Sequence, residues 1–222
     1  LNVPSGKTVY VAGGAIVRGC IRAVNARDVK ILGRGEVHPE GRGAGISIIN
    51  SRNIYVEGLI TTQCPTGGSD SVTIRNVKAI SSYGWGDGMN VFASNNVLFD
   101  GVFCRNSDDC TTVYATRMGF HGGCRNVTMQ NSTLWADVAH PIFIGLHGGV
   151  DRNEVMENLT YRNIDIMNNS DNASFKLAWI IPVLTVPVFG SIFYVFMYNQ
   201  FETRAMKKML VRLNGQMKLA YH

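Results

Sequence analysis

One short sequence pattern recurs along the chain as far as residue 163. It consists of a polar residue, often Asn, followed by alternating apolar and polar residues that end at Asn or Gly. The steps between its first apolar positions are 25, 18, 25, 30 and 32 residues, and those positions are Val29, Ile54, Val72, Val97, Val127 and Leu159. A unit this short cannot bury its own hydrophobic face, so the repeat predicts coils that stack on one another.

The alternation within each unit predicts strands with one face turned inward. Stacked coils bury that face against the coils above and below, and Asn or Gly at the corners tolerates a left-handed backbone. We therefore expect an all-β domain over residues 1–170, a right-handed parallel β-helix. The alternative is a β-sandwich of independent strands, but hairpin turns and a shorter, more even spacing would be typical of that fold.

Charge and cysteine content narrow the function. The net charge is +5, yet residues 1–170 hold 15 Lys and Arg against 14 Asp and Glu, so the basic excess lies in residues 171–222. A nearly neutral body argues against a nucleic-acid partner.

None of the five cysteines forms a C-x-x-C pair, which argues against a zinc site, and we expect no metal or other cofactor. Buried small residues explain the cysteines more simply.

Three aspartates lie about one repeat apart in Gly- and Asn-rich turns. Asp87 stands between two glycines, and Asp108 and Asp109 follow 21 and 22 residues later. Stacked coils would place these carboxylates in neighbouring rungs, and Asp108 and Asp109 can share one site only at a strand end or turn. Clustered carboxylates, one of them kept protonated, are what hydrolysis of a sugar linkage requires. Solvated turn aspartates or calcium ligands are the alternatives.

The residues around these aspartates resemble a known family. Gly86-Asp87-Gly88, Asn106-Ser107-Asp108-Asp109-Cys110 and the stretch from His140 to Gly145 are similar to the motifs of polygalacturonase-type glycoside hydrolases of family 28 and of their bacterial β-helical relatives. The resemblance implies an inverting enzyme that acts on pectin or a related polysaccharide. It also implies that Asp108 is the general acid, that Asp87 and Asp109 activate water, and that His140 assists.

The chain departs from the family pattern in three places. Trp85-Gly86 replaces Asn-Thr before Asp87, and Ala139-His140-Pro141 replaces Gly-His-Gly, which suggests a substrate other than plain polygalacturonate. The Arg-x-Lys pair of the family is absent where the next coil would begin, after Met167, so we expect a truncated β-helix. As substrate-binding residues we propose His147, Trp85, Asn90 and Arg117.

Residues 171–222 have a different character. Residues 177–198 form an apolar run of 22 residues interrupted only by Thr185 and Ser191, which is long enough to cross a bilayer as an α-helix. Five basic residues follow the run with Glu202 as the only acid, so this end is expected in the cytoplasm and residues 1–170 outside the cell or in the periplasm. A buried helix of a soluble domain is the alternative.

The tail has a resemblance of its own. Residues 172–212 resemble the membrane hairpin of bacterial cardiolipin synthases, without the His-x-Lys motifs that carry the chemistry of that family. Two unrelated resemblances that meet near residue 170 suggest either a membrane-tethered hydrolase or a reading frame joined from two genes. Three functions therefore stay open: a glycoside hydrolase, a non-catalytic β-helical protein that binds glycans, and a membrane fragment related to cardiolipin synthase.

Overall fold

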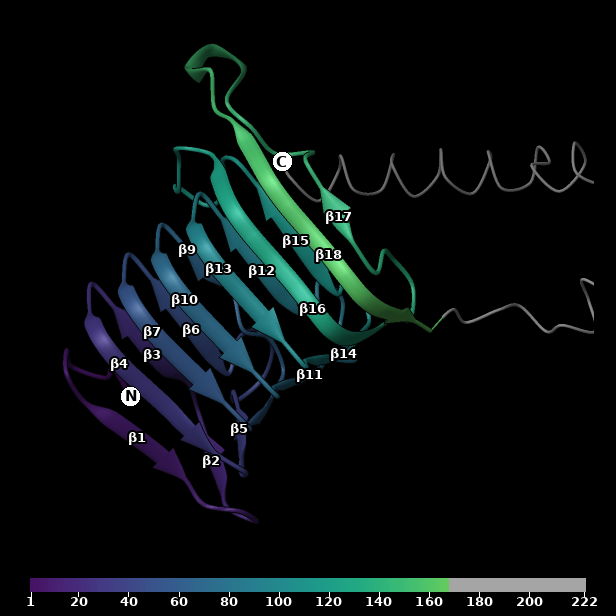
Figure 1. Ribbon diagram of the computed structural model, residues 1–222. Helices are drawn as coiled ribbons and strands as arrows, with labels where there is room; N and C mark the ends of the chain where they lie inside the picture. The colour runs from purple at the N-terminus through teal and green to yellow at the C-terminus, as the bar shows by residue number, and fades with distance from the viewer. Residues whose placement is uncertain (168–222) are drawn as a thin grey trace, which may run out of the picture. The chain divides into compact units, whose positions relative to one another are not determined.

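The computed structural model describes residues 1–167, and these residues form a parallel β-helix (Figure 1). Each coil contributes a strand to each of three faces, and every pairing between coils is parallel. The predicted tail helix and cytoplasmic tail, residues 171–222, lie outside the described residues. Within residues 1–167 we find no helix long and apolar enough to cross a membrane.

The strands of the first and second faces form one twelve-stranded sheet, which bends between the two faces. β16 is long enough to run through both faces, since its first part pairs with β13 and its second part with β14. The first face holds β1 (Thr8–Val11), β4 (Arg27–Gly33), β7 (Arg52–Glu57), β10 (Asp70–Arg75), β13 (Asn95–Asp100), β16 (Cys124–Ala136) and β18 (Met156–Ile166). The second face adds β2 (Ile16–Arg18), β5 (Glu36–His38), β8 (Ile60–Thr61), β11 (Lys78–Ile80) and β14 (Phe103–Asn106).

The third face is a separate six-stranded sheet. It consists of β3 (Ile21–Val24), β6 (Ile46–Ile49), β9 (Thr66–Gly67), β12 (Met89–Phe92), β15 (Thr111–Tyr114) and β17 (Phe143–Ile144). A single 3-10 turn, η1 (Val150–Arg152), precedes β18. The turns that lead into β12, β15 and β17 carry most of the residues of the candidate site.

The core consists of rows of aliphatic side chains that stack from coil to coil. The six first apolar positions of the repeat pair with one another across the first face, as Val29–Ile54–Val72–Val97–Val127–Leu159. All but Leu159 are buried, and Leu159 packs against the core from the last described strand. The predicted repeat and its stacking are therefore confirmed, and the β-sandwich alternative is wrong.

The corners of the coils adopt the left-handed backbone expected of them. The residues just before the six apolar positions, among them Asn53, Asn96 and Asn126, all have φ between 54° and 58°. Their side chains also bond between coils: Asn158 donates to Asn126 at 3.0 Å, and Asn126 donates to Asn96 at 2.9 Å. These ladders give hydrogen-bond partners to the polar Asn side chains that recur at the same corner of successive coils.

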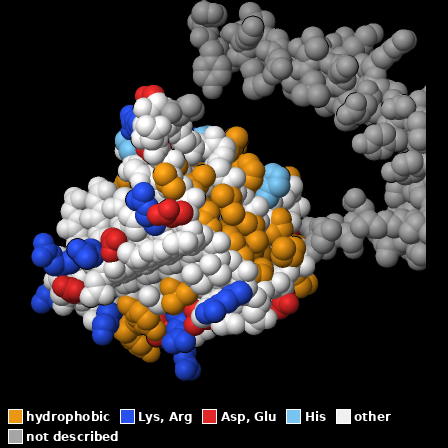
Figure 2. Space-filling model, turned by 45° about the horizontal axis from the view of Figure 1, so that its top comes forward, with side chains coloured by type: hydrophobic (Ala, Val, Ile, Leu, Met, Phe, Trp, Pro, Cys, Tyr) orange, Lys and Arg blue, Asp and Glu red, His pale blue; other side chains and the backbone are white. Residues whose placement is uncertain are grey.

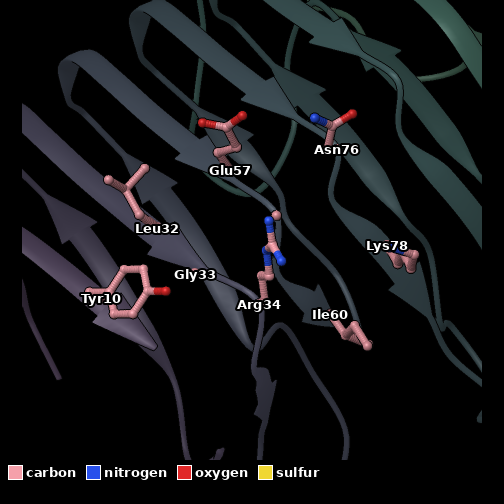
Figure 3. Close-up of a pocket in the computed structure, with 9 residues that line it drawn as sticks. Tyr10, Leu32, Gly33, Arg34, Glu57, Ile60, Asn76 and Lys78 are labelled. Atoms are coloured by element: carbon pink, nitrogen blue, oxygen red, sulfur yellow. The ribbon is translucent and has the colours of Figure 1, made fainter. Parts of the chain in front are cut away.

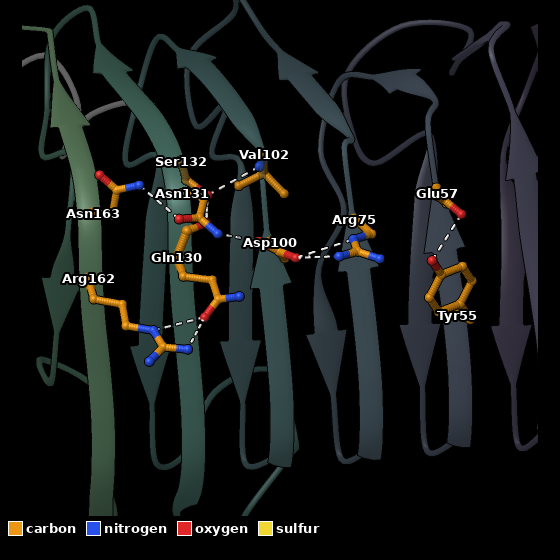
Figure 4. Close-up of polar contacts among 10 residues, drawn as sticks. All are labelled: Tyr55, Glu57, Arg75, Asp100, Val102, Gln130, Asn131, Ser132, Arg162 and Asn163. Atoms are coloured by element: carbon orange, nitrogen blue, oxygen red, sulfur yellow. Dashed lines mark hydrogen bonds and ion pairs between the residues drawn. The ribbon is translucent and has the colours of Figure 1, made fainter.

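A second set of polar ladders crosses the outer side of the first face (Figure 4). Asn163 donates to Asn131 at 2.8 Å, Asn131 donates to Asp100 at 2.8 Å, and Arg75 bonds the other oxygen of Asp100 at 3.0 Å. These contacts lie at the surface, so each contributes little to stability on its own. The outer side of the first face is therefore a polar surface whose side chains bond from coil to coil.

Candidate active site

All eight residues proposed from the sequence line one cleft of about 430 Å³ on the third face. They come from the turns before β12, β15 and β17, from β12 itself in the case of Asn90, and from the segments after β15 and β17. The four proposed catalytic residues are Asp87, Asp108, Asp109 and His140, and the four proposed substrate-binding residues are Trp85, Asn90, Arg117 and His147. The structure thus brings together side chains that lie up to 62 residues apart in the sequence.

The strand register aligns three of the catalytic candidates. β12 and β15 pair Met89 with Thr111, so two positions earlier Asp87 lies level with Asp109, and the Gly88 N–H donates to the Asp109 carbonyl at 2.9 Å. On the next coil, the Cys110 N–H donates to the His140 carbonyl at 2.9 Å. Asp87, Asp109 and His140 therefore come from three successive coils.

Asp108 and Asp109 both face the cleft because they lie in the turn before β15 and not within a strand. The Asp109 N–H donates to Asp108 Oδ1 at 3.0 Å, which holds the Asp108 side chain against its own turn. The register places Asp109 beside Asp87, and Asp108 precedes that position by one residue within the turn.

Asp109 and His140 are joined by two contacts. Asp109 is buried with 7% of its surface exposed, and its Oδ1 lies 3.0 Å from both the backbone nitrogen and the ring Nδ1 of His140. A carboxylate can only accept, so the proton of the neutral imidazole is on Nδ1 when Asp109 is ionised. Nε2 is then the acceptor and is free to interact with substrate.

The Gly-Asp-Gly stretch has a steric explanation. A Cβ at position 88 would lie 2.4 Å from the Cys110 carbonyl oxygen and 2.5 Å from Asn106 Oδ1, and a Cβ at position 86 would lie 2.6 Å from Ser107 Oγ. Buried Asn106 donates to Ser81 Oγ at 2.8 Å and to the Asp87 carbonyl at 3.1 Å. The two glycines therefore let the coil approach its neighbour closely enough to hold Asp87 in the cleft.

Asp87 has a perturbed acidity. Its pKa is raised to about 6, mainly by burial and to a smaller extent by the charges of Asp108 and Asp109, against the hydrogen bond that it accepts from Asn90 Nδ2 at 2.7 Å. Arg117 acts in the opposite direction on Asp87, and together with burial it lowers the pKa of His147. Perturbed carboxyls in a cleft are typical of catalytic sites.

Aromatic side chains that sequence reasoning did not identify form one wall of the cleft. Phe92 and Tyr114 stack with ring centroids 5.9 Å apart, and Tyr114 meets His147 edge-on at 4.8 Å. Burial and the charges of Asp109 and Asp87 raise the pKa of Tyr114 to about 12. A sequence signal for this wall exists: Phe92 and Tyr114 occupy the same position in successive repeats, and the strand register pairs them directly.

A larger hollow of about 550 Å³ lies elsewhere, on the outer side of β4 and β7 (Figure 3). Its lining includes Tyr10, Arg34 and Lys78, and Glu57 is its only carboxylate. Hydrolysis of a glycosidic bond needs one carboxyl group as the acid and another as the base, and a hollow with a single carboxylate cannot supply both. The smaller cleft is therefore the candidate active site, although it is not the largest hollow of the described residues.

Known proteins similar to this chain include exopolygalacturonases. The exopolygalacturonase of Cochliobolus carbonum is 25% identical over 78% of this chain, and the probable exopolygalacturonase X of Aspergillus niger is 30% identical over 41% of it. The solved structure of a family 28 exopolygalacturonase from Yersinia enterocolitica superposes on 78% of the chain with a TM-score of 0.52 and 14% identity. The chain has a polygalacturonase-type fold.

The likeness covers only part of these proteins. The chain spans 38% of the length of the Cochliobolus relative, 19% of the Aspergillus relative and 58% of the Yersinia chain. A family model described as phospholipase D-nuclease N-terminal matches residues 163–197. That match is consistent with the cardiolipin synthase-like tail expected from the sequence.

Within the part of the chain that the structure describes, no group of three or more His, Cys, Asp or Glu side chains is placed to hold a metal ion. All five cysteines are free, and four of them, Cys64, Cys104, Cys110 and Cys124, are buried in the core as expected.

Proposed function

We propose that the β-helix hydrolyses O-glycosidic bonds of pectin or a related plant or microbial polysaccharide, with inversion of configuration. The observation that carries this proposal is the convergence of Asp87, Asp108, Asp109 and His140 from three coils on one cleft. The likeness to exopolygalacturonases supports the same reaction class.

In the proposed mechanism Asp108 donates its proton to the glycosidic oxygen as the bond to the anomeric carbon breaks. Asp87 and Asp109 hold a water molecule on the opposite side of the sugar and take its proton as it attacks. Asp109 also holds His140, whose Nε2 then faces the sugar near the acid. The raised pKa of Asp87 suits a base, because a carboxylate of higher pKa takes a proton from water more readily.

Release of reducing ends tests the proposal. The full chain is incubated with pectic and related polysaccharides, and Asp108→Asn is compared with Asp165→Asn, which replaces an exposed aspartate of β18 outside the cleft. We expect release by the native chain and by Asp165→Asn, and at least a thousandfold loss in Asp108→Asn with an unchanged melting temperature. Unchanged release of reducing ends by Asp108→Asn would show that Asp108 has no part in the mechanism.

A non-catalytic glycan-binding protein is the second candidate. The aromatic wall formed by Phe92, Tyr114 and Phe143 favours it, since such rings bind sugars without any chemistry. This candidate predicts binding without release of reducing ends, and binding that Asp108→Asn leaves unchanged.

For the tail we propose a membrane segment at residues 177–198 with a cytoplasmic C-terminus, which places the β-helix outside the cell or in the periplasm. The phospholipase D-nuclease N-terminal match at residues 163–197 supports a membrane-protein origin. Single long DNA reads across the codons for residues 160–185 decide how the two parts are joined. A continuous frame supports a membrane-tethered hydrolase, and a broken frame supports a joined reading frame.

A further inference from the structure

Three large apolar side chains stand at the cleft with most of their surface exposed. Trp85 is 83% exposed, Met118 73% and Leu146 72%, and all three line the cleft although they come from three separate turns. We call these three residues the apolar rim. Figure 2 shows that hydrophobic side chains gather in one area of the molecular surface. The apolar rim lines the same cleft as the three aspartates.

The backbone of the apolar rim is also unusual. Trp85, Met118 and Leu146 have φ angles of 63°, 51° and 63°, in the left-handed region that non-glycine residues seldom adopt. Elsewhere in the described residues most left-handed positions are held by Gly or Asn. Strained backbone together with exposed apolar surface is unfavourable for the free protein, and such combinations occur where a ligand is bound.

The wall beneath the rim is apolar too. Phe92 stacks on Tyr114, Phe143 meets Tyr114 edge-on with centroids 6.2 Å apart, and Phe143 stacks on His140 at 4.7 Å. The apolar surface is thus continuous from the rim to the ring of His140, beside the reacting groups.

The charges of the cleft disfavour an anionic sugar. Three aspartates line it, and Arg117 is the only Lys or Arg of residues 1–167 among its lining residues. The influence of Arg117 on Asp87 shows that its charge already acts on the catalytic carboxylates. A sugar carboxylate in this cleft would be repelled by the aspartates and would have no separate cation to pair with. An uncharged group would not be repelled.

We propose that the cleft selects a sugar whose substituent at the rim is uncharged and apolar, such as a methyl-esterified carboxyl in place of a free carboxylate. This inference rests on the proposed function and specifies its substrate. Met118 and Leu146 cover the substituent together with Trp85, and the sugar ring lies against Tyr114 and Phe143.

The full chain is tested on two oligogalacturonides of equal length, one fully methyl-esterified and one de-esterified. We expect kcat/KM to be at least about tenfold higher on the ester, which is the discrimination that one apolar group provides in a fitted pocket. Leu146→Asn and Met118→Asn keep a residue that tolerates the left-handed backbone, and each should lower kcat/KM on the ester by about tenfold. Val138 is 84% exposed and lies outside the cleft, so Val138→Asn is the control and should leave kcat/KM on the ester unchanged.

Equal or better cleavage of the de-esterified substrate overturns the inference and leaves the proposed function intact. Binding of both oligosaccharides to Asp108→Asn, measured by calorimetry, separates the remaining outcomes. Tighter binding of the ester with no hydrolysis by the native chain supports the inference and overturns the proposed function. Binding of neither, or equal binding of both, overturns the inference.

Discussion

The backbone N–H and the ring Nδ1 of His140 both lie 3.0 Å from Oδ1 of Asp109. This double contact joins two successive coils at the point where the chain bends into the cleft. It fixes the imidazole in one orientation although the side chain of His140 is 60% exposed. The histidine is therefore positioned by a buried carboxylate together with the stacked ring of Phe143.

Replacing His140 by Ala should lower kcat about a hundredfold, because an oriented imidazole near the acid contributes about 10²-fold or more to proton transfer. The fold should survive, since the ring is largely exposed. Steady-state kinetics and thermal melting measure both effects. His121→Ala, an exposed turn histidine outside the cleft, is the matched control. Equal kcat values in the two variants would contradict the role of His140.

The pH dependence of kcat/KM should show a limb near pH 6. If Asp87 is a base, it must be ionised, so the rate should fall as the pH drops through about 6. Initial rates on a neutral substrate between pH 3.5 and 8, a range set about the raised pKa of Asp87, measure this limb. A rate that instead falls as the pH rises through about 6 would make Asp87 the acid and exchange its role with that of Asp108.

Asp87→Asn should stabilise the protein at neutral pH. The native state holds the Asp87 proton more tightly than the unfolded chain does, so this group favours the native state below about pH 4, and the contribution is lost as pH rises through about 6. We expect the variant to gain about 1–2 kcal/mol of unfolding free energy at pH 7.5 and nothing at pH 3.5, after allowance for partial solvation. Urea unfolding at both pH values checks this, and a gain that is the same at both would contradict it.

Gly88→Ala should destabilise the fold by about 1–3 kcal/mol, because the new Cβ would overlap the Cys110 carbonyl and Asn106. It should also reduce activity by displacing Asp87. Gly84→Ala is the matched control: it lies four residues away in the same segment, its φ is not positive, and its Cβ would meet nothing within 4 Å. Unfolding curves that move equally in both variants would show that close approach is not what position 88 requires.

The fold could be predicted because interior positions repeat. Stacked coils need an apolar residue at the same place in each coil, so the spacing of Val29, Ile54, Val72, Val97 and Val127 in the sequence predicts the register of the first face. Corner residues such as Asn126 were predictable for the same reason, since a left-handed backbone favours few residue types.

The cleft could be predicted only in part. The eight proposed residues share it, but their roles stay predictions, and the alignment of Asp87 with Asp109 depends on how the turn before β15 runs. Met118 and Leu146 carried no sequence signal, because an isolated apolar residue in a loop is usually unremarkable. Their place at the cleft follows only from the path of the turns after β15 and β17.

The anomeric form of the first product tests the central claim most directly. If Asp87 and Asp109 activate water while Asp108 protonates the leaving oxygen, no covalent intermediate forms. Proton NMR within the first minutes of hydrolysis should then show a reducing sugar of configuration opposite to the bond cleaved. A product of retained configuration would contradict direct attack by water, and the absence of any product from every substrate would contradict catalysis itself.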